Sequence, residues 1–182
     1  NVELTPTERA AAFRMRFNGG DSAYVVLDAC NGGSYIKVIP EQWRIVGYST
    51  KNNGGVGPAF KNFFVITFNR PFLNATIWKD KQLLDGQYEQ QGQHVGAVVG
   101  FDLKRGETVE MHIATSYISQ EQAELNLREI GNQSFDEVKA KAEQTWDAEL
   151  AKVSVVGGTH DELRTFYTCL YRMLIFPRKF YE

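Results

Sequence analysis

Turn-forming residues divide the first two thirds of the chain into short stretches, and this spacing constrains the fold more than any other feature. Eight stretches show the alternation or the short apolar run of a β-strand. Turns such as 18–21 and Asn31-Gly32-Gly33, and a glycine-rich loop at 52–57, separate them. The expected strands are residues 13–17, 23–27, 34–39, 43–48, 63–68, 75–78, 96–101 and 109–113.

No helix alternates with these strands, which argues against a parallel α/β sheet. The predicted fold class is therefore mainly β, an antiparallel sandwich or barrel. The run 23–27 is apolar throughout, and such a run predicts a strand buried on both faces.

The periodicity changes to that of helices after about residue 117. Capping boxes, in which a side chain at each end satisfies a backbone donor of the first turn, occur at Ser119/Gln122, Ser134/Glu137 and Thr159/Glu162. They predict a short helix ending at Gly131, a longer helix with a stripe from Phe135 to Val153, and a final helix.

The final helix is apolar on nearly all sides. One stripe follows the helical repeat, and it consists of Leu163, Phe166, Tyr167, Leu170, Tyr171 and Leu174. The other side carries Cys169, Met173 and Phe176, and Pro177 is expected to end the helix. The helix could pack on the sandwich, but the preferred interpretation is that it is the first helix of a second, all-helical domain that this sequence does not contain.

Composition excludes several classes of protein. The 182 residues suffice for one domain, or for one domain and part of another. A net charge of -2 with no large basic cluster argues against nucleic acid as a partner. No apolar run is long enough for a membrane span.

Few residues suggest chemistry of their own. Cys30 and Cys169 are expected to be buried free thiols, and the three histidines show no zinc-ligand spacing. His112 alternates with Glu110, which predicts a solvated strand face. Trp43 and Trp78 could stack on sugar rings, although core packing is the commoner use of tryptophan in strands. No catalytic residue and no metal ligand is assigned.

Several stretches together resemble glycoside hydrolase family 92, the bacterial exo-acting α-mannosidases. They are residues 3–9, 63–72, 115–119 with Ala123 and 126–127, 135–136 with Trp146, and 166–171. Their order and spacing span nearly the whole chain. Two positions depart from the pattern, since Pro6 stands where a small residue is usual and Arg172 where a histidine often follows the Leu-Tyr pair.

The resemblance implies an N-terminal β-sandwich at residues 1–117 that lacks its earliest loops, a helical linker at 118–158, and the first helix of a missing (α/α)6 barrel from 159 to 182. It implies an inverting, calcium-dependent exo-α-1,2-mannosidase of the periplasm or the secreted fraction, whose acid, base and calcium ligands come mostly from the barrel. The chain alone is then expected to bind no calcium and to be inactive. Packing between domains is assigned to Phe166, Tyr167, Leu170, Tyr171 and Phe176.

Three hypotheses stay open on the sequence alone. The chain is part of such a mannosidase, or a carbohydrate-binding sandwich module, or a structural domain that forms a homodimer through its last helix. The first predicts no hydrolysis by this chain alone. The second predicts glycan binding by the isolated chain, and the third a particle of two chains.

Overall fold

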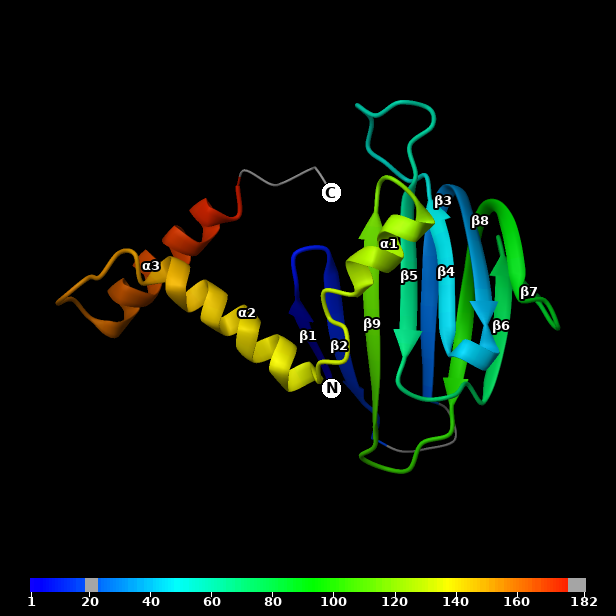
Figure 1. The fold of residues 1–182 in the computed structure, drawn as a ribbon, viewed down its shortest axis with the longest axis horizontal. Coiled ribbons are helices and arrows are strands. Elements are labelled where there is room, and N and C mark those ends of the chain that lie inside the picture. Colours follow the sequence, from blue (N-terminus) through cyan, green and yellow to red (C-terminus); the bar gives the residue numbers. More distant parts are fainter. Residues whose placement is uncertain (19–22, 177–182) are drawn as a thin grey trace. The chain divides into compact units, whose positions relative to one another are not determined.

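The computed structural model describes residues 1–18 and 23–176, and it divides the chain into two compact units, Asn1–Val138 and Lys139–Glu182. Residues 19–21 of the predicted turn at 18–21, and Pro177 with the residues after it, lie outside the described residues. The first unit holds nine strands, one short helix and the start of a second helix (Figure 1). The division of the chain at residues 117 and 158 stays a prediction.

All strand pairs are antiparallel, and they form one sheet in the order β1-β2-β9-β5-β4-β3-β8-β6-β7. The strands are β1 (Val2–Pro6), β2 (Ala10–Arg16), β3 (Ala23–Ile39), β4 (Arg44–Ser49), β5 (Asn62–Phe68), β6 (Asn74–Lys79), β7 (Gln82–Leu84), β8 (Glu89–Phe101) and β9 (Thr108–Ser116). A 3₁₀ turn, Pro40–Gln42, joins β3 to β4.

The sheet folds into two layers because its two longest strands, β3 and β8, pair with each other along most of their length but with their other neighbours over only part of it. Residues 34–39 of β3 pair with β4, whereas residues 95–100 of β8, opposite the first half of β3, pair with β6. Register shifts between Asp28 and Ser34 mark the change of neighbour. The rings of Phe68 in β5 and Phe101 in β8 lie 5.4 Å apart although three strand pairings separate these strands. The mainly β, antiparallel sandwich predicted from the sequence is thus confirmed.

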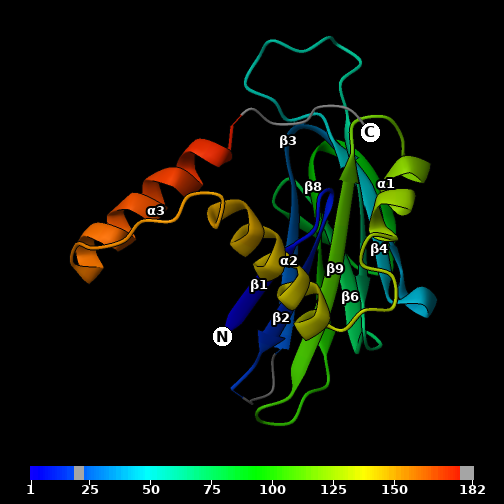
Figure 2. The same ribbon diagram turned by 60° about the vertical axis from the view of Figure 1, so that its left-hand side comes forward.

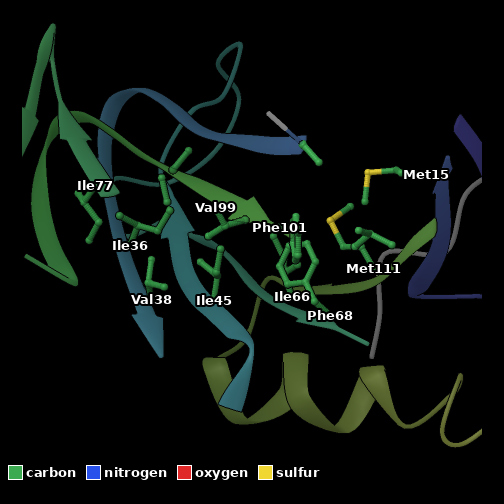
Figure 3. Close-up of a cluster of buried hydrophobic side chains, with 14 of the residues drawn as sticks. Met15, Ile36, Val38, Ile45, Ile66, Phe68, Ile77, Val99, Phe101 and Met111 are labelled. Carbon is green, nitrogen blue, oxygen red and sulfur yellow. The ribbon is translucent and has the colours of Figure 1, made fainter. Parts of the chain in front are cut away.

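The core between the layers is aliphatic and aromatic. Figure 3 shows buried side chains that point toward one another, among them Met15, Ile36, Ile45, Phe68 and Met111. Ile36, Ile45 and Ile77 are 0% exposed. These residues alternate with outward-facing ones along each strand, as the period of two requires.

Several strand predictions were incomplete or wrong. Residues 23–39 form one strand, and the expected turn at Asn31-Gly32-Gly33 is an irregularity within it. The run 23–27 is not buried on both faces, because Val26 is 66% exposed. β1 and β7 were missed. Pro6 argues against a strand, but β1 lies at the sheet edge, where a missing backbone donor can be tolerated.

A second buried cluster covers the outer face of β2, β9 and β5. Ala10, Ala12, Val65 and Ala114 on the sheet pack against Ala123, Ile130, Phe135 and Val138. Ala123 lies in the first helix, Phe135 and Val138 in the second, and Ile130 between the two. Helix α1 (Gln120–Leu127) contacts β9 and β5, and Figures 1 and 2 both show it lying along this face. The small side chains of the sheet let the helix backbone approach closely.

The helices begin where the sequence predicted. Ser119 Oγ accepts from the backbone N–H of Gln122, but the Gln122 amide donates to Asn126, so only half of that capping box forms. The boxes at Ser134/Glu137 and Thr159/Glu162 are complete. They begin α2 (Phe135–Leu150) and α3 (His160–Leu174).

Phe135 offers a test of the second cluster, since it is 1% exposed and links the start of α2 to the sheet. Phe135→Ala is expected to lower the free energy of unfolding by about 3–5 kcal/mol, because it removes a large buried side chain and leaves a cavity. Denaturant unfolding measures the loss. The matched control is Phe176→Ala, which changes a 68% exposed phenylalanine and is expected to cost under about 0.5 kcal/mol. Equal effects of the two substitutions would contradict this packing.

Candidate functional site

The last helix carries the residues assigned to packing between domains. Its start is set by Thr159, whose N–H donates to Glu162 Oε2 at 2.7 Å while the N–H of Glu162 donates to Thr159 Oγ1 at 3.3 Å. The backbone hydrogen bond from Thr159, and then that from its hydroxyl, lower the pKa of the Glu162 carboxyl below its usual value. The chain therefore enters α3 in a defined conformation, and the apolar stripe begins on its first turns.

None of the described side chains of α3 is buried. Of the residues assigned to interdomain packing, Phe166 is 38%, Tyr171 42% and Phe176 68% exposed, whereas Tyr167 and Leu170 are partly covered. Cys169, and Cys30 in β3, are both exposed, so the prediction of buried thiols was wrong. Cys30 is exposed because it lies at the irregularity of β3, where its backbone φ is +66°.

Part of the stripe already packs within the second unit. The ring of Tyr171 lies 4.6 Å from that of Trp146 in α2, and the Tyr167 hydroxyl donates to the Val153 carbonyl at 3.0 Å. These contacts pair the end of α2 with α3. They leave Met173 73% and Leu174 40% exposed, so the stripe offers more apolar surface than this helix pair covers.

Glu129 joins the segment after α1 to the N-terminal strands. Its Oε2 accepts from the Thr7 hydroxyl at 2.6 Å and from the Arg9 N–H at 2.8 Å, and its Oε1 faces the Arg9 guanidinium at 3.2 Å. The Glu129 side chain is only 24% exposed, and its hydrogen bonds compensate for the partial loss of water around the charge.

Arg14 ties β2 to the first turn of α2. Its guanidinium donates two bonds to Asp136, at 3.0 and 2.9 Å, and one to Glu110 at 3.2 Å, and it lies 4.4 Å from the centre of the Phe135 ring. The hydrogen bonds to Asp136 are the main cause that raises the pKa of Arg14 above its usual value. The Glu129 and Arg14 groups, here called the linker clamp, hold α1 and the start of α2 on the sheet.

The three histidines, and Trp43 and Trp78, make none of the hydrogen bonds of the linker clamp described above. His112 is half-buried with its Nε2 unpartnered among the described residues, and burial lowers its pKa, so the predicted solvated position was wrong. His94 Nε2 lies 2.7 Å from Asp28 Oδ1, and its ring meets that of Trp78 edge-on at 4.7 Å. His160 is exposed, and Trp43 is 38% exposed at the start of β4.

No metal-binding group of three His, Cys, Asp or Glu side chains exists in residues 1–18 and 23–176. No helix of these residues is long and apolar enough to cross a membrane.

Sequence reasoning missed the linker clamp, because its partners lie far apart along the chain. Arg14 and Asp136 are separated by 122 residues, and Arg9 and Glu129 by 120. One signal was available: Asp136 lies inside the capping box that opens α2, and it belongs to one of the stretches that carry the family resemblance.

The described residues thus form a β-sandwich with helices packed on one face, followed by a helix with an exposed apolar stripe. The N-terminal domain model of glycosyl hydrolase family 92 matches residues 1–116, and the catalytic domain model of that family matches residues 122–182. The chain belongs to glycosyl hydrolase family 92.

Solved structures of this family match over the whole chain. The family GH92 inverting mannosidase BT2199 from Bacteroides thetaiotaomicron shares 39% identity with a TM-score of 0.96, covering 100% of this chain and 25% of that one. The family GH92 α-mannosidase BT3965 from the same species shares 26% identity with a TM-score of 0.87, covering 100% of this chain and 26% of that one. The chain thus spans about a quarter of the length of these relatives. No curated protein matches it.

Glu129→Gln tests the linker clamp. The substitution keeps the shape of the side chain but removes its negative charge. That charge faces the Arg9 guanidinium and accepts hydrogen bonds from the Arg9 N–H and the Thr7 hydroxyl. The substitution is therefore expected to lower the free energy of unfolding by about 1–3 kcal/mol. Hydrogen exchange of the α1 amides should accelerate with it. Glu143→Gln is the control, because Glu143 is 62% exposed and faces only Lys139 at 3.8 Å. Unchanged α1 exchange in Glu129→Gln would show that the linker clamp does not hold the helix.

Proposed function

We propose that the protein to which this chain belongs is an exo-acting α-1,2-mannosidase that hydrolyses mannose-containing glycans with inversion. The observation that carries this proposal is the whole-chain match, at 39% identity, to a structure described as an inverting mannosidase. The match of residues 122–182 to the catalytic domain model supports it further. Because the chain spans a quarter of such relatives, hydrolysis is assigned to the longer protein.

The role proposed for this chain is structural support of the helical catalytic domain. The linker clamp holds α1 and the start of α2 on the sandwich. α3 presents Phe166, Tyr167, Leu170 and Tyr171 to further helices of that domain, and Phe176, just after α3, does the same. Burial of each large apolar side chain there would contribute about 1.5–3 kcal/mol. The exposed fractions of Phe166, Tyr171 and Phe176 support this assignment.

Inverting hydrolysis requires an acid that protonates the leaving oxygen and a base that activates water, with about 6.5–9.5 Å between the two carboxyl groups. We assign both groups, and the ligands of a calcium ion that would bind sugar hydroxyls, to parts of the longer protein outside residues 1–182. The share of the relatives that this chain covers, about a quarter of their length, supports this assignment.

The same proposal places the protein in the bacterial periplasm or outside the cell, where mannose-containing glycans are met. The relatives named above come from Bacteroides thetaiotaomicron. The net charge of -2 supports a partner other than nucleic acid.

Hydrolysis is tested by comparing the longer protein with the 182-residue chain on α-1,2-mannobiose. The longer protein is expected to release β-mannose first, as proton NMR of the anomeric signal would show, and to lose activity when a chelator removes calcium. The 182-residue chain is expected to give no more product than buffer. Normal turnover by the short chain would overturn the assignment of the catalytic groups, and release of α-mannose by the longer protein would overturn inversion.

The exposed stripe of α3 also favours a second candidate function, a domain that forms a homodimer through this helix. Light scattering of the purified 182-residue chain would then give the mass of two chains, and Phe166→Ser with Tyr171→Ser would restore one. Under the mannosidase proposal the longer protein is expected to bury these residues internally, so the double substitution should destabilise it rather than change its mass. Asp161→Ser serves as control, since it changes an 80% exposed side chain of the same helix.

A further inference from the structure

The outer face of β3, β8 and β6 has a regular arrangement of glycines and aromatic rings. β8 carries Gly92, Gly96 and Gly100 at intervals of four residues, and in its second half the even-numbered positions face away from the buried core. Tyr24 of β3 and Asn74 of β6 pair with Gly100, while Asp28 and Trp78 pair with Gly96. This face, here called the outer platform, consists of Tyr24, Val26, Asp28, Asn74, Thr76, Trp78, His94, Gly96, Val98 and Gly100.

The two aromatic rings lie against the sheet because glycine leaves them room. A Cβ on Gly96 would stand 2.3 Å from two ring atoms of Trp78, and a Cβ on Gly100 would stand 2.7 Å from the Tyr24 ring. A glycine within a strand weakens it and commonly marks a place where another group approaches closely. Each ring thus lies close to a glycine of β8, and Tyr24 remains 45% exposed.

The rings lie about 13 Å apart along β8, since four strand residues separate the glycines beneath them. Val26, which is 66% exposed, lies in the row between the two aromatic residues. A flat surface of this length suits a short oligosaccharide rather than a single sugar. The face of an aromatic ring is electron-rich, so the weakly positive C–H groups of a pyranose pack on it, as the edge of another aromatic ring does.

Polar groups flank the rings where sugar hydroxyls would reach. Asp28 is held in one orientation, because its Oδ1 accepts from the Cys30 N–H at 2.7 Å and lies 2.7 Å from His94 Nε2. Both contacts are made by Oδ1. Among the described residues no hydrogen bond to Oδ2 is found, so Oδ2 can accept one from a ligand. The Asn74 amide and the Thr76 hydroxyl add donors and acceptors on the other side.

Charge narrows the class of ligand. The ten residues of the outer platform include one carboxylate and no lysine or arginine. Phosphate groups of nucleic acid or lipid need basic side chains, so the outer platform favours a neutral ligand. We propose that the outer platform binds a short neutral oligosaccharide, separately from hydrolysis. The proposal does not depend on the mannosidase assignment, because it concerns binding by the sandwich alone.

The test uses the 182-residue chain, labelled with ¹⁵N and titrated with α-1,2-mannotetraose and, separately, with cellotetraose. Binding with a Kd on the order of 1 mM is expected for at least one of them, with shifts of the Trp78 indole and of the amides of Tyr24, His94 and Gly96. Trp78→Ala and Tyr24→Ala should each weaken binding at least tenfold, whereas Trp78→Phe, which keeps a ring, should retain most of it.

Trp43→Ala is the matched control, since Trp43 is a 38% exposed tryptophan outside the outer platform, and it should leave binding unchanged. Absence of shifts with both saccharides, shifts confined to other surfaces, or equal loss in Trp43→Ala would overturn the proposal. A folded Trp78→Phe that loses all binding would do the same. None of these outcomes bears on hydrolysis by the longer protein, which the mannobiose assay measures independently.

Discussion

Burial on both faces of the strands β2, β9 and β5 is the constraint on which the first unit depends. Val65 and Ile66 are neighbours in β5, yet one faces the helices and the other the sandwich core, and they are 0% and 1% exposed. Strands of this kind need a layer on each side. α1 and the start of α2 supply the second layer, so they belong to the sandwich as much as the strands do.

The linker clamp adds directional contacts to that apolar packing. Apolar contact alone would let a helix slide along the sheet, because the hydrophobic effect is non-directional. The Arg14 fork with its two bonds to Asp136, and the Glu129 carboxylate with its bonds from Thr7 and Arg9, set one position along the strand direction. The chain therefore leaves the sandwich from a defined place on β2 and β9, and Glu129 and Asp136, which fix that place, already belong to the segment 122–182 that matches the catalytic domain model.

The two units differ in how their apolar residues are used. In the first unit two buried clusters enclose many of the apolar side chains, and the aromatic residues of the outer platform lie against glycines. In α3 no side chain of the stripe is buried, although Tyr171 contacts Trp146 and the Tyr167 hydroxyl donates to Val153. Apolar surface of the second kind fits packing against further helices, whereas rings flanked by Asp28 and Asn74 fit a ligand with hydroxyl groups.

The sequence by itself determined the class of fold, the positions of the helix starts and the apolar character of α3. These are local properties: a period of two or of 3.6 residues and a capping box are complete within a few neighbours. Only the tertiary structure decided that residues 23–39 form one strand shared by two layers, because that depends on pairing with both β4 and β8. It also decided that Glu129 meets Arg9, that His112 is half-buried, and that Trp78 lies over Gly96. Each of these contacts joins residues that are distant along the chain or on different strands, and no local pattern records them.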